Sequence, residues 1–173
     1  MRSTIKIVIL LFFICTSMSG ASFPDMEKYM RQHALIWEQL PMQWNEGAFL
    51  GNGLVGMMVY ADSTLNALVF HLGRPDVTDH RKAPYRKTSI GTEEADKMVD
   101  FCRLDVGKML LFPEGKILSG TFYLDIYNAE LTGHLKTDKG DLTFHAYTPQ
   151  PEEVNIVEVS SGVPYRWKGI PGN

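Results

Sequence analysis

Apolar and polar residues alternate along the carboxyl-terminal half of the chain. Phe122, Leu124 and Ile126 alternate with Tyr123 and Asp125. Strands with this pattern bury one face and expose the other, as the strands of antiparallel sheets do. The alternation, together with short apolar runs nearer the amino end, predicts strands in residues 54–60, 67–72, 121–127, 131–135, 142–146 and 154–160.

Turn-forming residues separate these runs. Residues 138–141 (DKGD) predict a hairpin turn in which Gly140 is available for a positive φ. Turns are also predicted at residues 128–129 and 62–63. Short strands spaced about ten residues apart predict an all-β fold, an antiparallel β-sandwich. Residues 164–173 show no closing element, so we expect an incomplete sandwich.

One or two short helices accompany the strands. Residues 25–37 predict a helix capped by Asp25, with Met26, Tyr29, Met30 and His33 along one side. Residues 73–92 are polar and basic and predict a long loop. A second helix is predicted over residues 93–102, with Thr92 as its cap.

The amino end has the three parts of a cleavable signal peptide. A basic stretch precedes an apolar run over residues 7–15, and the small residues Ser19 and Ala21 then fit the cleavage pattern. The apolar run is shorter than the roughly 20 residues of a membrane span. A buried first strand and a lipid anchor on Cys15 are the alternatives. We expect residues 1–21 to be removed and the protein to be secreted or periplasmic.

The mature chain, residues 22–173, is acidic. It has 173 − 21 = 152 residues, and the signal contains two of the 17 basic residues, so its formal charge is 15 − 20 = −5. This charge argues against nucleic acid or an anionic membrane surface as partner and is compatible with a neutral sugar. Cys102 is the remaining cysteine, so no internal disulfide forms. It has no evident histidine partner, which favours an inert thiol over a nucleophile.

Residues 51–56 (GNGLVG) spell the glycine pattern of a dinucleotide-binding loop, with Asp76 downstream. That site needs a hydrophobic strand before the glycines and a helix after them. Residues 44–48 do not form such a strand, and the apolar run that follows stops at Asp62. A tight loop that leads into the strand at residues 54–60 is the favoured interpretation.

Three phrases resemble a known enzyme family. They are residues 44–60 (WNEGAFLGNGLVGMMVY), 71–81 (HLGRPDVTDHR) and 124–133 (LDIYNAELTG). In this order they resemble the N-terminal β-sandwich of large bacterial glycoside hydrolases of the α-L-fucosidase-like group, glycoside hydrolase family 95 and its relatives. The resemblance covers residues 37–160. It implies a sandwich of the supersandwich type in an enzyme that acts on oligosaccharides or polysaccharides.

In that family the catalytic carboxylates belong to an (α/α)₆ barrel that follows the sandwich. The sequence ends at Asn173 without such a barrel, so we expect a fragment, a truncated product or a degenerate copy. The resemblance therefore supplies no catalytic residue. We expect no cofactor and no metal, and the chain alone to be inactive.

Asp76 and Asp79 are the obvious carboxylate pair, with His80 beside them. Glycoside hydrolysis needs two carboxyl groups at a fixed separation. The alternatives are a salt-bridged loop with Arg74 and Arg81, an edge of a sugar site completed by the barrel, and independent catalysis. A zinc site on the same residues lacks a further ligand at suitable spacing. The candidate substrate-binding residues are Arg74, Asp76, Asp79, His80, Arg81, Trp44 and Asn52.

Four aromatic residues, Trp37, Trp44, Tyr60 and Trp167, either stack on sugar rings or belong to the core. Two functions follow. The first is the N-terminal sandwich of an exported glycoside hydrolase, which packs on the barrel and lends residues 73–82 to the substrate cleft. The second is a free-standing carbohydrate-binding module. A module binds glycans alone through an exposed aromatic platform, whereas a docking domain exposes an apolar face.

Overall fold

The structure, a computed structural model, describes residues 25–78 and 103–172. The chain divides into two compact units, residues 1–33 and 34–173. The described part of the first unit contains helix α2 (Met26–Arg31), whose N-terminal amide at Lys28 donates to the Asp25 carboxylate at 3.2 Å. The predicted cap is therefore confirmed. The predicted helix is shorter than expected, because the residues that follow it form a strand instead.

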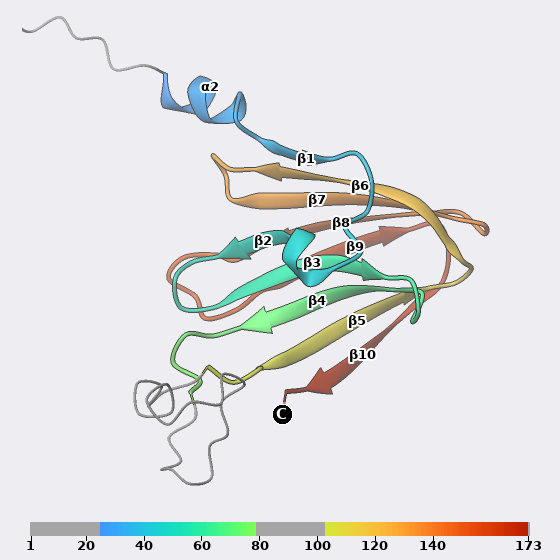
Figure 1. Ribbon diagram of the computed structural model, residues 1–173. Coiled ribbons are helices and arrows are strands. Elements are labelled where there is room, and N and C mark those ends of the chain that lie inside the picture. The colour runs from blue at the N-terminus through green and yellow to red at the C-terminus, as the bar shows by residue number, and fades with distance from the viewer. Residues whose placement is uncertain (1–24, 79–102, 173) are drawn as a thin grey trace, which may run out of the picture. The chain divides into compact units, whose positions relative to one another are not determined.

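The second unit is an antiparallel β-sandwich, as the alternation predicts. Sheet A has the strand order β1-β6-β7-β8-β9, and sheet B has the order β10-β5-β4-β3-β2 (Figure 1). The strands of sheet A are β1 (Leu35–Trp37), β6 (Ile117–Asp125), β7 (Glu130–Thr137), β8 (Asp141–Tyr147) and β9 (Ile156–Ser161). Those of sheet B are β2 (Ala48–Gly51), β3 (Gly56–Asp62), β4 (Ala67–Gly73), β5 (Gly107–Pro113) and β10 (Tyr165–Pro171).

The predicted turns join neighbouring strands in both sheets. Gly140 has a φ of 151° between β7 and β8, and Ala129 has a φ of 56° between β6 and β7. Asn66, with a φ of 51°, ends the turn between β3 and β4. A short 3-10 helix, η1 (Trp44–Glu46), precedes β2.

The core lies between the inner faces of the two sheets. Its centre is a set of three aromatic rings that meet edge to face. The centroid of Phe144 lies 5.4 Å from that of Phe70 and 5.5 Å from that of Phe122, with interplanar angles of 82° and 81°. Each ring is fully buried, and burial of such a side chain contributes about 2–3 kcal/mol. Edge-to-face contact adds about 1 kcal/mol per pair.

Strands β2, β5 and β10 lie at positions where the sequence analysis predicts no strand. Ala48 and Leu50 of β2 are buried, so a hydrophobic strand does precede the glycine loop. Strand β3 follows that loop instead of a helix, and Gly53 takes a φ of 91° in the hairpin. This arrangement lacks the helix N-terminus that a dinucleotide pyrophosphate needs. Residues 164–173 also contain a strand, β10, where no element was predicted.

Candidate functional site

The three phrases of the family resemblance meet at one end of the sandwich. Gly56, at the start of β3, pairs with Gly73, at the end of β4. Asn52 and Gln150 line a hollow of about 480 Å³ together with Asn128, from the third phrase. We call this end, made of residues 51–56, 73–78, 126–129 and 148–155, the loop end.

Asn52 ties two of these segments together. Its amide nitrogen donates to the carbonyl oxygens of Pro149 at 2.8 Å and Glu152 at 2.7 Å. Its side-chain oxygen accepts from the backbone amides of Leu54 at 3.0 Å and Val55 at 3.1 Å. The Asn52 side chain thus makes four hydrogen bonds within the protein, and its contact with a ligand stays a prediction.

Arg74 occupies the centre of an ion-pair network. Its Nε donates to Asp76 Oδ1 at 2.6 Å and its Nη2 to Asp76 Oδ2 at 3.0 Å. Its Nη1 donates to Glu153 Oε2 at 2.5 Å. The hydrogen bond from Arg74 holds the pKa of the Asp76 carboxyl below its ordinary value, and the two carboxylates raise the pKa of Arg74. Asp76 is therefore ionised at neutral pH.

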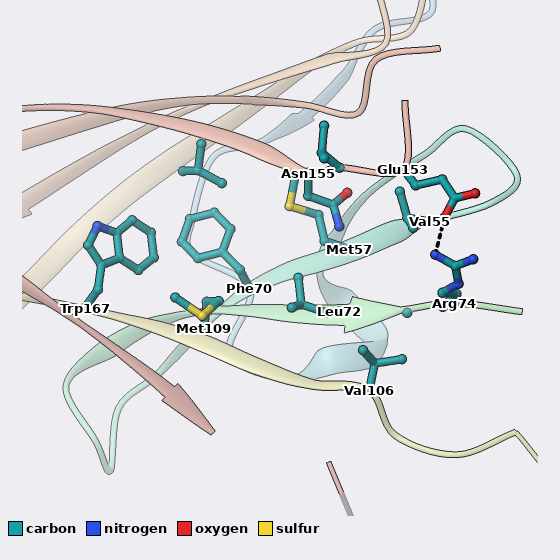
Figure 2. Close-up of a pocket in the computed structure, with 13 residues that line it drawn as sticks. Val55, Met57, Phe70, Leu72, Arg74, Val106, Met109, Glu153, Asn155 and Trp167 are labelled. Carbon is teal, nitrogen blue, oxygen red and sulfur yellow. Dashed lines mark hydrogen bonds and ion pairs between the residues drawn. The ribbon is translucent and has the colours of Figure 1, made fainter. Parts of the chain in front are cut away.

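An apolar groove of about 680 Å³ begins beside this network (Figure 2). Arg74 and Glu153 lie at one end of the groove and Trp167 at the other, with Leu72 and Met109 along the floor between them. We call it the β9–β10 groove. Its remaining wall residues are Val55, Met57, Phe70, Gly73, Val106, Val154, Asn155 and Val157.

The predicted aromatic residues have different surroundings. Trp37 packs against the core and its Nε1 donates to the Glu46 carbonyl oxygen at 2.9 Å, and Tyr60 packs on a second apolar cluster of sheet B. Trp44 is 63% exposed, and Trp167 is 37% exposed in the groove. Trp44 and Trp167 therefore offer indole surface to a partner.

The structure brings together only part of the predicted site. Arg74 and Asp76 are in direct contact, and Asn52 lies at the same end of the sandwich. Asp79, His80 and Arg81 lie outside the described residues, as do the predicted helix over residues 93–102 and Cys102. A general acid for glycoside hydrolysis needs a raised pKa. Asp76 has a lowered one, so its environment suits hydrogen bonding to hydroxyl groups better than proton donation.

Sequence reasoning missed Glu153, Gln150 and Asn155. Glu153 belongs to a polar segment, residues 148–155, that carries no motif. Its partner Arg74 lies 79 residues earlier, and only the pairing of the strands brings the two together.

Among the described residues, no three or more histidine, cysteine, aspartate or glutamate side chains gather as a metal site would require. None of the helices within residues 25–78 and 103–172 has the length and apolar character needed to cross a membrane.

Comparison with protein-family models finds no match to this chain, and comparison with curated proteins finds none either. What the loop end does is therefore inferred from its residues and their geometry.

Proposed function

We propose that this chain is the N-terminal β-sandwich domain of an exported glycoside hydrolase similar to family 95. In this proposal the loop end forms one side of a glycan cleft, and an (α/α)₆ barrel supplies the two catalytic carboxyl groups. The sandwich packs on that barrel and shapes the cleft without performing proton transfer itself.

The convergence of the three phrases carries the proposal. Residues 44–60, 71–81 and 124–133 are separated along the chain, yet their loop residues gather at one end of the sandwich. The phrases also contain core residues of both sheets, such as Val59 and Leu131, so the proposal depends on the polar loop residues that they share. Loops carried on a rigid scaffold are the usual place for binding residues.

The polar groups at the loop end suit a neutral, hydroxyl-rich ligand. Arg74 carries one positive charge, and Asp76 and Glu153 carry two negative charges, so an anionic ligand gains no net attraction there. Asn128 and Gln150 add amide groups that both donate and accept hydrogen bonds. Sugar hydroxyls likewise both donate and accept.

The first test is the mass of the native protein in its producing cell, detected with an antibody against residues 110–160. The proposal expects a band several times larger than 19.5 kDa. The protein isolated with that antibody should hydrolyse fucosides or related glycosides, whereas residues 22–173 alone should not. A band at or below 19.5 kDa, with no glycosidase activity, would reject the proposal.

The contribution of the loop end is tested in the same active protein. Arg74→Ala should raise KM about tenfold and leave kcat within a factor of about two, because it removes binding that ground and transition states share. Arg166→Ala is the matched control, since Arg166 lies over the Phe112 ring at 4.2 Å, on the outer face of sheet B. Equal effects of the two variants would argue against a cleft at the loop end.

A free-standing carbohydrate-binding module is the second candidate, and the exposure of Trp44 favours it. Its indole is 63% exposed, as a stacking platform for sugar rings would be. Residues 22–173 should then bind a glycan in an array, and Trp44→Ala should abolish that binding. Glycan binding by the isolated chain that depends on Trp44, without hydrolysis by the native protein, would select this candidate.

A further inference from the structure

Two sheet edges that no strand of the described residues pairs with border the β9–β10 groove. Strand β9 ends the order of sheet A and strand β10 ends that of sheet B. Within residues 25–78 and 103–172, no other strand pairs with the free side of either one. Each edge therefore presents backbone amides and carbonyl groups in the spacing that a further strand needs.

The two sheets are offset, so that sheet B extends beyond the edge of sheet A. Phe70 of β4 lies under Phe144 of β8 and is 1% exposed. Met109, the partner of Phe70 on β5, is 37% exposed although it faces the same way, and so is Trp167 on β10. The inner face of β10, and that of β5 at Met109, thus lack the cover that the inner face of β4 has, whereas Leu111 of β5 is buried in the core.

We propose that the β9–β10 groove receives one β-strand of another polypeptide, which adds to the free edge of β9. Neighbouring strands lie about 4.8 Å apart, so a strand beside β9 would lie over β10 and cover Trp167 and Met109. Apolar side chains of that strand would fill the groove, and its backbone would pair with β9. An aliphatic small molecule would fill the groove but leave the backbone groups of β9 without partners.

The neighbouring side chains define the chemistry of the added strand. Val157 and Val159 of β9 pack toward the core, so the alternate residues of the added strand that face inward should be apolar. Glu158 faces outward, lies 3.3 Å from His145 and has a largely exposed side chain. A lysine or arginine beside Glu158 on the added strand would pair with it. The partner is therefore an extended segment of about six residues with inward apolar residues and a basic outward residue.

The offset argues against a second copy of this chain as the occupant. If β9 paired with its equivalent in a second copy, the β10 strand of each copy would lie beneath the β9 strand of the other. That position is already occupied by β5, which pairs with β10 along its whole length. The groove therefore accepts one added strand and excludes a symmetric pair joined through β9.

The test uses residues 22–173 and a synthetic strand peptide of about eight residues, with valine at alternate positions and threonine and lysine between them. Fluorescence anisotropy measures its affinity, and hydrogen exchange locates the amides that it protects. We expect binding, and slower exchange within Ile156–Ser161. A peptide of the same sequence with N-methylated amides on one edge should bind at least about tenfold more weakly, because it cannot pair with β9.

Variants of groove residues test whether the peptide binds in the groove. Trp167→Ala should weaken binding about tenfold, through lost apolar contact, and Glu158→Lys about threefold. Lys168→Ala is the matched control, because Lys168 neighbours Trp167 on β10 and should leave affinity unchanged. Circular dichroism verifies folding, and Met109→Ala replaces Trp167→Ala if that variant unfolds.

Three results would overturn this inference. They are absence of binding at millimolar peptide, equal binding of the N-methylated peptide, and concentration-dependent dimers of residues 22–173 in which β9 is protected without peptide. None of these measurements involves glycans or the native mass. The inference can therefore fail while the proposed function stands, and the reverse also holds.

Discussion

Arg74 and Glu153, which are 79 residues apart in sequence, form an ion pair with a 2.5 Å contact between Nη1 and Oε2. The pair joins the segment after β4 of sheet B to the segment before β9 of sheet A. Arg74 also binds Asp76 through two nitrogens, so one guanidinium fixes its own turn and the neighbouring loop. Arginine suits this role because its donors form a planar fork.

Replacing Arg74 should loosen the loop end without unfolding the sandwich. For Arg74→Ala we expect faster amide exchange in residues 148–155 and an almost unchanged unfolding midpoint, because the ion pairs lie at the surface. Arg74→Lys should show a similar local effect, since one ammonium cannot replace the bidentate contact with Asp76. Unchanged exchange in both variants would show that the ion pair does not order this loop.

Asn52 should contribute more to stability than Arg74. Asn52→Ala removes four hydrogen bonds, at about 0.5–1 kcal/mol each, so we expect the free energy of unfolding to fall by about 2–4 kcal/mol. Urea unfolding measures the change. Asn52→Asp keeps the two accepted bonds but places carboxylate oxygen against the carbonyls of Pro149 and Glu152. It should therefore destabilise the chain at least as much as Asn52→Ala. An Asn52→Asp variant with unchanged free energy of unfolding would contradict this prediction.

Four of the five strands of sheet A could be predicted from the sequence, but β1 lies where a helix was expected, and in sheet B only β3 and β4 could be predicted. Strands β6, β7 and β8 bury one face only, so apolar and polar residues alternate along them. Strand β5 has buried residues on both faces, Leu111 in the main core and Leu110 in the second cluster, and it therefore shows no alternation. Strand β10 is exposed along its length, and its alternation covers only residues 165–168.

The loop end could be predicted only in part, for a related reason. The phrases containing Asn52 and Arg74 were recognised, but the residues that these two bind lie about 80 to 100 positions later in a segment without a motif. Their contact depends on β9 following β8 in sheet A and on the packing of the two sheets. Neither follows from local residue patterns.

The His71–Asp105 pair predicts a component of acid sensitivity. Burial opposes ionisation of Asp105, but hydrogen bonds from His71 Nε2 at 2.9 Å and the Gly107 amide at 3.0 Å outweigh it and lower the pKa of this carboxyl. The unfolded chain therefore binds a proton at Asp105 before the folded chain does. This stabilisation is complete above about pH 5 and is lost as the pH falls through and below about 4.

The matching variant is Asp105→Asn, followed by urea unfolding from about pH 3 to about pH 7. It should be less stable than the parent at neutral pH, by about 0.5 kcal/mol after allowance for solvent exposure of the pair, and equal to it near the acid end of the range. His71→Ala should also reduce the pH dependence of the free energy of unfolding, because it removes one of the two hydrogen-bond donors to Asp105. A difference between parent and Asp105→Asn that stays constant with pH would exclude this linkage.

Gly133 is a core position that leaves no room for a side chain. It lies opposite Phe144 in the β7–β8 pair, and a Cβ atom at Gly133 would fall 1.9 Å from the Phe144 ring. Phe144 cannot move aside freely, because Phe70 and Phe122 contact it from two directions. Gly133→Ala should therefore lower the free energy of unfolding by about 2–3 kcal/mol, as overpacked cores do.

Gly169→Ala is the matched control, since a Cβ atom there meets only the Met109 sulfur at 3.5 Å, an ordinary contact. Its effect should stay within about 0.5 kcal/mol. Combining Gly133→Ala with Phe144→Leu should cost less than the sum of the two single changes, because the smaller side chain makes room for the new methyl group. Additive effects in urea unfolding would show instead that the loss of stability does not come from contact with the Phe144 ring.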